Sequence, residues 1–114
     1  MRAPPKKDVF EFLDSARVEM RNNRFTFLHR CTEDIIDLGL TISLAKQEIM
    51  DLQLEDYDRG PTPDHNQDGT DVWEFGKEVG GVLVYIKLKI HPIRGLICMS
   101  FKKSDGPFTL PYKK

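Results

Sequence analysis

Hydrophobic and polar positions alternate most regularly near the end of the chain. In residues 82–90 the even positions are aliphatic, whereas the odd positions carry Tyr85, Lys87 and Lys89. This period of two predicts a strand with one face in the core and one polar face. Residues 96–102 predict a second strand, in which the odd positions hold the large apolar side chains. Its polar face is expected to hold the even positions, Cys98, Ser100 and Lys102.

A turn at residues 91–95 predicts that these two strands pair antiparallel. Core residues must face core residues across the ladder, so paired residues must have numbers of opposite parity. A turn centred between Ile93 and Arg94 then puts Tyr85 opposite Lys102. The shared polar face carries a phenol and several ammonium groups, which suits an anionic ligand such as a phosphodiester. A solvated face with lysines for solubility and edge protection explains the same pattern.

A third strand is predicted at residues 71–76. Its side chains alternate, with Trp73 and Phe75 directed inward and Glu74 directed to the other face. A glycine-rich connection over residues 76–81 makes a hairpin into the long strand that follows. Opposite parity applies across this ladder as well. Glu74 is therefore expected on the polar sheet face described above.

Helical spacing of apolar residues dominates the start of the chain. Positions 9, 12, 13, 16 and 20 are apolar and predict an amphipathic helix over residues 8–21, within an N-terminal segment of residues 1–23. Residues 24–28 alternate weakly and predict a short strand or an extended connection. Residues 104–114 have too little apolar pattern for a regular element. We expect them to form a C-terminal tail.

Two further helices are predicted in the middle of the chain. Residues 32–38 begin with the capping residue Thr32 and early acidic residues, and Gly39 is a natural stop. A helix capped by Thr41 or Ser43 continues from there towards residue 51, followed by one more turn at 54–57. Residues 60–69 have no periodicity and several helix breakers, which predicts a loop.

Together these elements predict an α+β fold. The N-terminal helices pack on one face of a small antiparallel sheet, whose core strands are residues 71–76, 82–90 and 96–102. At 114 residues the chain is expected to form one domain.

Charge is strongly segregated along the chain although the formal net charge is only −1. Residues 31–74 hold two Lys or Arg against twelve Asp or Glu, whereas residues 75–114 hold eight against two. A basic C-terminal third agrees with a local anion site. The acidic middle is also explained as a solvated helix face, the usual fate of charge runs.

Several classes of protein and of site do not fit the sequence. No apolar run approaches the roughly 20 residues of a membrane span, and the charged N-terminal segment does not resemble a secretory signal, so we expect a cytoplasmic protein with no membrane partner. Cys31 and Cys98 are too few for a disulfide framework and lack metal-ligand spacing. Residues 64–69 match the opening of a calcium loop, but Phe75 stands where the bidentate glutamate belongs. We therefore expect no metal and no cofactor.

Residues of the polar sheet face can supply each role in RNA cleavage. Attack by the 2′-hydroxyl needs a base, cations to stabilise the phosphorane oxygens, and an acid for the leaving 5′-oxygen. We expect Glu74 as the base, Lys102 and Arg59 as phosphate ligands, and Tyr85 as a proton-transfer or orienting group. Substrate-binding positions are expected at three further residues, Lys87, Lys89 and His91.

A family resemblance supports the same reading. The segments at residues 37–40, 54–57, 72–74, 84–87 and 99–102 occur in an order similar to that of MqsR-type toxins. The most specific pieces are the Trp strand, the Tyr-x-Lys strand and the Ser-Phe-Lys ending. These toxins belong to bacterial toxin-antitoxin systems and are small messenger-RNA endonucleases related in fold to the RelE group. The resemblance therefore implies a RelE-like α+β fold and a cognate antitoxin protein as partner.

The active residues of that family map onto this chain with two departures. The strand tyrosine falls on Tyr85 and the final lysine on Lys102, both unchanged in type. The family's lysine after an Asp-aromatic-Tyr turn falls on Arg59, which can still bind phosphate with a different geometry. The glutamine after the Trp falls on Glu74, which adds a negative charge. We therefore expect Glu74 to act as the general base. The proline-rich loop and the tail have no counterpart, which puts the sequence specificity for RNA in doubt.

Three alternatives stay open. A non-catalytic module can use the same basic face to bind RNA or an acidic protein. A degenerate toxin can retain antitoxin binding without cleavage. The RNA target can be messenger RNA, free or on the ribosome, or transfer RNA.

Overall fold

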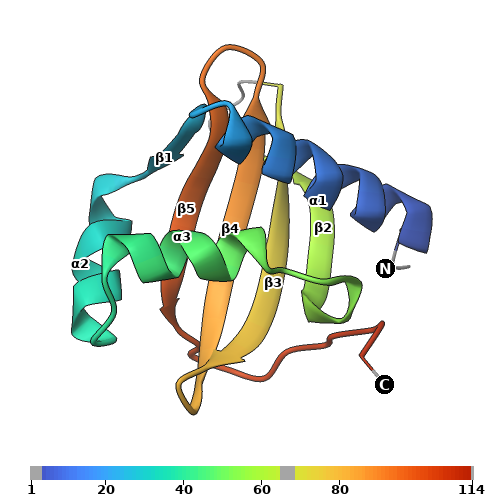
Figure 1. The fold of residues 1–114 in the computed structure, drawn as a ribbon. Coiled ribbons are helices and arrows are strands. Elements are labelled where there is room, and N and C mark those ends of the chain that lie inside the picture. The colour runs from blue at the N-terminus through green and yellow to red at the C-terminus, as the bar shows by residue number, and fades with distance from the viewer. Residues whose placement is uncertain (1–3, 65–68, 114) are drawn as a thin grey trace.

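The computed structural model describes residues 4–64 and 69–113, and over these residues the chain has an α+β fold. Three α-helices and five strands are present in this part of the chain (Figure 1). The strands lie in the order β1-β5-β4-β3-β2. In chain order the elements are α1 (Lys6–Arg21), β1 (Phe25–Phe27), α2 (His29–Asp37), α3 (Ile42–Met50), the short 3-10 turn η1 (Leu54–Asp56), β2 (Tyr57–Pro63), β3 (Asp71–Val79), β4 (Val82–His91) and β5 (Gly95–Lys103).

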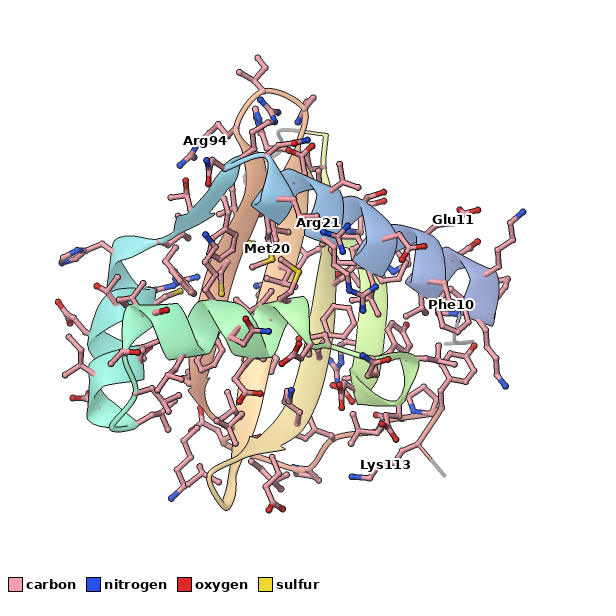
Figure 2. All side chains as sticks on the ribbon, in the orientation of Figure 1. Phe10, Glu11, Met20, Arg21, Arg94 and Lys113 are labelled. Carbon is pink, nitrogen blue, oxygen red and sulfur yellow. The ribbon has the colours of Figure 1, made fainter. Side chains whose placement is uncertain are left out.

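Helices α1 and α3 cross one face of the sheet, and the main core lies between them and the strands (Figure 1). The five apolar positions predicted for α1 are all buried in this core, including Met20, which Figure 2 labels at the end of α1. The Phe12 ring stacks on Trp73 of β3 with ring centroids 4.8 Å apart. Trp73 and Phe75 both face this core, which confirms the predicted alternation of β3.

The second helix begins earlier than predicted. Its first residue is His29, and Thr32 is not the cap but an internal residue, whose hydroxyl donates to the His29 carbonyl at 2.6 Å. The reason is that β1 continues directly into the helix, since the Leu28 N–H still donates to the Cys98 carbonyl of β5. Of the two predicted caps, Thr41 and Ser43, it is Thr41 that caps α3, because its side chain accepts from the Leu44 N–H at 3.0 Å.

The hairpin between β3 and β4 is tighter than predicted. The strands pair as far as Val79 and Val82, and the turn consists of Gly80 and Gly81 alone. Both glycines have positive φ, 58° and 82°, as a two-residue hairpin turn of the primed type requires. The predicted connection over residues 76–81 is therefore mostly strand.

Pairing of β4 with β5 confirms the central register and corrects one of its consequences. Tyr85 pairs with Lys102, as predicted. The register shifts by one after Lys87, and Met99 is left without a pairing partner on β4. This bulge reverses the parity of β5, so Cys98 faces the main core and not the polar face. Ile97 and Met99, predicted to face the core, form a second cluster with Val72.

The two edge strands were the least well predicted. The sheet is mixed and not purely antiparallel, because β1 pairs parallel with β5. Residues 60–63 belong to β2 although their prolines predicted a loop. Because β2 is the edge of the sheet, Pro61 and Pro63 can lie in it without a lost ladder bond. Residues 65–68 of the predicted loop lie outside the described residues.

None of the helices within residues 4–64 and 69–113 combines the length and the apolar character needed to cross a lipid bilayer.

Candidate functional site

Four neighbouring strands contribute side chains to a single cavity on the sheet face opposite α1 and α3. The cavity has a volume of about 330 Å³. Its lining includes the four predicted catalytic residues: Arg59 of β2, Glu74 of β3, Tyr85 of β4 and Lys102 of β5. The strand order brings them together, because Arg59 pairs with Glu74 and Tyr85 pairs with Lys102. We call the sheet face that carries these four residues the open face.

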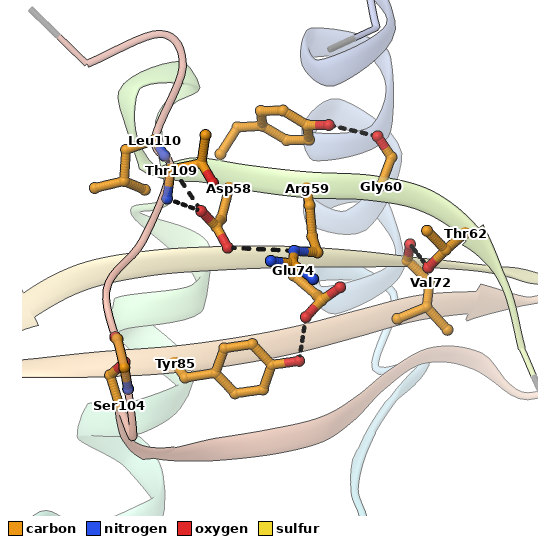
Figure 3. A network of polar contacts seen from close by, with 12 residues as sticks. Asp58, Arg59, Gly60, Thr62, Val72, Glu74, Tyr85, Ser104, Thr109 and Leu110 are labelled. Atoms are coloured by element: carbon orange, nitrogen blue, oxygen red, sulfur yellow. Dashed lines mark hydrogen bonds and ion pairs between the residues drawn. The ribbon is translucent and has the colours of Figure 1, made fainter. Parts of the chain in front are cut away.

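Tyr85 and Glu74 are joined directly across the two strands. The Tyr85 hydroxyl donates to Glu74 Oε1 at 2.5 Å (Figure 3). Burial raises the pKa of Tyr85 well above its ordinary value, and the hydrogen bond to the Glu74 carboxylate and its negative charge raise it further. The phenol is therefore protonated at neutral pH and acts as a hydrogen-bond donor.

The two cations of the cavity are held loosely. Lys102 Nζ lies 3.5 Å from Asp105 Oδ2, and the lysine side chain is 44% exposed. Arg59 Nε lies 3.8 Å from Asp58 Oδ2, and the arginine side chain is 63% exposed. An exposed ion pair such as Lys102–Asp105 contributes little to stability, about 1 kcal/mol or less. Asp58, by contrast, is buried, so it is Lys102 that can exchange its partner for a phosphate at small cost.

The C-terminal tail forms one wall of the cavity, a feature that the sequence did not reveal. Residues 104–108 are part of the lining. Asp58 anchors the segment that follows, because its Oδ1 accepts from the N–H groups of Thr109 at 2.6 Å and Leu110 at 3.2 Å (Figure 3). Further along, the Tyr112 hydroxyl donates to the Pro4 carbonyl.

Glycine at position 76 makes room for this wall. A Cβ atom built on Gly76 of β3 would lie 2.6 Å from the Phe108 ring. The ring therefore rests directly on the strand backbone beside the cavity. The sequence pattern did not predict several residues of the site, namely Asp58 and the tail residues 104–108. Their segments have no periodic pattern, and Asp58 is one of several acidic residues around the turn at η1.

The three predicted substrate-binding residues are not part of the cavity lining. Lys87 is partly exposed and pairs in register with Glu74 and Ser100 on the open face. Lys89 lies further along β4, is only 6% exposed and forms an ion pair with Asp64.

His91 serves the β4–β5 turn. Its Nδ1 accepts from the N–H groups of Ile93 and Arg94, each at 3.1 Å. Figure 2 shows Arg94 at the end of the molecule opposite Lys113 of the tail. The structure therefore keeps His91 with the turn and does not bring it to the cavity.

Among the described residues there is no group of three or more His, Cys, Asp or Glu side chains that could hold a metal ion. The calcium-like motif extends over residues 65–68 and so falls in part outside the described residues. Cys31 and Cys98 are both buried free thiols.

No protein-family model, curated protein or solved structure matches this chain. The resemblance to MqsR-type toxins therefore stays a prediction, and the chemistry of the cavity has to carry any proposal about function.

Proposed function

We propose that this protein is a metal-independent endoribonuclease, the toxin of a type II toxin-antitoxin pair, which cleaves messenger RNA in the cytoplasm and arrests growth. One observation carries the proposal: a tyrosine and a carboxylate share a hydrogen bond of 2.5 Å in a cavity that is flanked by Lys102 and Arg59. This set contains a base, a proton donor and two cations. A cognate antitoxin is part of the same proposal and rests on the family resemblance.

The cations suit the phosphate. A scissile phosphate lying between Arg59 and Lys102 replaces Asp105 beside Lys102 and joins Asp58 beside Arg59, since the Asp58 carboxylate stays bound to the tail. Attack by the neighbouring 2′-oxygen gives a phosphorane whose oxygens carry more negative charge than the phosphodiester. Positive groups beside these oxygens stabilise this charge most strongly in the transition state, so they lower the barrier more than they tighten binding.

The hydrogen bond between Glu74 and Tyr85 allows both side chains to regain their starting protonation states after cleavage. Glu74 takes the proton of the 2′-hydroxyl as the 2′-oxygen attacks phosphorus. Tyr85 gives its proton to the 5′-oxygen as the bond between phosphorus and that oxygen breaks. The proton on Glu74 then passes to the Tyr85 oxygen through their shared hydrogen bond. The products are a 2′,3′-cyclic phosphate and a 5′-hydroxyl, and both side chains return to their starting states.

The electrostatics of the pair favour this order of events. Glu74 raises the pKa of Tyr85 both through the hydrogen bond and through its charge. When Glu74 accepts a proton its charge disappears, and the pKa of Tyr85 falls. The phenol thus becomes a better acid at the step in which the leaving oxygen needs a proton.

The main alternative is a module that only binds RNA. Such a module has no evident use for the Glu74 carboxylate. Asp58 anchors the tail and Asp105 pairs with Lys102, whereas Glu74 contacts Tyr85. A carboxylate beside a phosphate opposes simple binding by charge repulsion. Its presence between two phosphate ligands favours a role as a base.

Induced expression in a bacterium tests the proposal. Wild type and Lys102→Ala are expressed side by side, and growth is read together with RNA 5′ ends across the transcriptome. We expect arrest and discrete new ends with wild type and neither with the variant. Expression of Lys113→Ala, which changes a lysine outside the cavity, is the matched control and should behave like wild type. Absence of new ends with wild type would contradict the proposal.

A further inference from the structure

A second hollow adjoins the cavity, and nothing in the proposed mechanism uses it. It has a volume of about 570 Å³ and shares residues 104–107 with the first cavity. The two hollows therefore lie on either side of one short tail segment. This segment is held to β4 by a hydrogen bond from the Ser104 N–H to the Leu83 carbonyl at 2.9 Å.

The second hollow differs from the first in chemistry. Its lining includes the apolar residues Leu83 and Pro107 and the charged residues Lys103 and Asp105. Leu83 is 49% exposed, which is unusual for a leucine in a central strand. Gly81 also lines it, and a Cβ built there would meet nothing within 4 Å. Apart from the residues that it shares with the first cavity, its lining consists of Gly81, Val82, Leu83 and Lys103, and it is therefore more apolar than the cavity beside it.

Leu83 and Tyr85 are two residues apart on β4, so their side chains point to the same sheet face. Residues with this spacing are about 7 Å apart along a strand. An extended nucleic-acid strand advances by a comparable distance per nucleotide. A strand whose phosphate lies at Lys102 and Tyr85 therefore brings an adjacent nucleotide to Leu83.

From this juxtaposition we infer that the second hollow is a subsite for the nucleobase next to the scissile phosphate. Leu83 and Pro107 contact the face of the base. This inference rests on the proposed function, and it specifies single-stranded RNA as the substrate class, because a base within a duplex does not present its face. The apolar contact is tolerant of base identity, since every base has an apolar face.

The test measures the affinity of a short RNA that cannot be cleaved. The probe is a fluorescent tetranucleotide with a 2′-deoxy group at the cleavage position, and a second series of probes carries one abasic position, moved along the strand. Wild type should lose about fivefold in affinity when the abasic position is next to the scissile phosphate, the loss expected for a modest apolar contact. Leu83→Ala should bind the intact probe about fivefold more weakly and be insensitive to that abasic position.

Leu44→Ala is the matched control, because Leu44 is a leucine of similar exposure, 54%, on α3. It should behave like wild type with every probe. If wild type cleaves the all-ribose form of the probe, but no abasic position changes its binding, the base subsite is wrong while the proposed function stands. If no RNA binds to wild type, both proposals fail together.

A second copy of this chain is the other occupant that the test distinguishes. Sedimentation velocity of wild type and Leu83→Ala detects it. A dimer in wild type that is lost in Leu83→Ala would assign the hollow to self-association and overturn the subsite.

Discussion

The hydroxyl of Tyr85 donates to the carboxylate of Glu74 across two central strands of the sheet, at 2.5 Å. Tyr85 does not pair with Glu74 in the ladder, since its partner on β3 is Gly76. The contact is diagonal, because Glu74 lies two residues before that glycine on the same face of β3. In our proposal this contact is the route by which the proton taken from the attacking 2′-hydroxyl returns to the tyrosine.

Tyr85→Phe removes the donor and keeps the ring. We expect cleavage to fall by about 10²- to 10⁴-fold, the usual contribution of a proton-transfer group. RNA affinity should change by less than about threefold, because Lys102 and Arg59 are untouched. Single-turnover cleavage and equilibrium binding separate the two effects. Tyr112→Phe, which removes a hydroxyl outside the cavity, should cleave at the wild-type rate. Equal losses in the two variants would argue against a role for the Tyr85 hydroxyl.

Glu74→Gln removes the charge that raises the pKa of Tyr85 while keeping its size and hydrogen-bonding ability. The pKa of Tyr85 should therefore fall towards the ordinary value, without reaching it, because burial also raises it. NMR titration of ring-labelled tyrosine measures the shift, with Tyr85→Phe used to assign the resonance. Cleavage should be lost in the same variant. An unchanged Tyr85 titration would show that the two groups are not coupled in solution.

Alkaline pH should destabilise the protein through the buried tyrosines. Burial is the main cause that raises the pKa of both Tyr57 and Tyr85 above that of a tyrosine in the unfolded chain. The unfolded state therefore loses these protons first as pH rises, and the free energy of unfolding should decrease from about pH 10 upward. Urea unfolding at a series of pH values measures it. Tyr85→Phe should flatten the dependence, and an unaltered slope would contradict the assignment.

Asp58→Ala should release the tail from the edge of the sheet. The substitution leaves the N–H groups of Thr109 and Leu110 without their acceptor, which costs about 1–3 kcal/mol in the free energy of unfolding if they stay buried. Hydrogen exchange of these two amides should become faster, while amides of β4 keep their protection. Asp105→Ala is the control, since that carboxylate is exposed and accepts from Lys102 only at 3.5 Å. Unchanged exchange at residues 109 and 110 would contradict the anchoring role.

Gly76→Ala tests whether the tail wall matters for the cavity. The added methyl group would overlap the Phe108 ring, so the ring should be displaced. Cleavage should fall because the wall moves away from Tyr85 and Lys102, whereas the strand itself tolerates alanine. The double variant Gly76→Ala/Phe108→Ala removes the overlap. If steric displacement explains the loss, the double variant should cleave at the rate of Phe108→Ala and far faster than Gly76→Ala. Losses of the two single variants that simply add in the double variant would contradict this explanation.

Period-two patterning predicted the central strands and the site residues they carry. The register of Tyr85 opposite Lys102 depends only on the turn position and on the requirement that core faces core. The same reasoning failed past Lys87, because the unpaired Met99 reverses the parity of β5 and sends Cys98 to the core. A bulge has no signature in the alternation when apolar residues occupy both faces.

The remaining failures have a different cause. Residues 60–63 looked like a loop because prolines interrupt them, and only the position of β2 at the sheet edge makes a strand possible there. The tail is held by isolated contacts, such as that of Asp58 with Thr109, between residues 51 positions apart. Contacts of this kind leave no periodic trace, so the wall of the cavity and the second hollow could not be predicted.

Cleavage of one defined RNA by the purified protein tests the central claim most directly. The substrate is a single-stranded oligonucleotide with a sequence taken from a site mapped in cells, assayed in the presence of EDTA. We predict cleavage with a 2′,3′-cyclic phosphate on one product and a 5′-hydroxyl on the other, identified by mass spectrometry. A 2′-deoxy group at the cleavage position should abolish the reaction, and so should Lys102→Ala. Cleavage that EDTA prevents, or that persists with the 2′-deoxy substrate, would contradict the account.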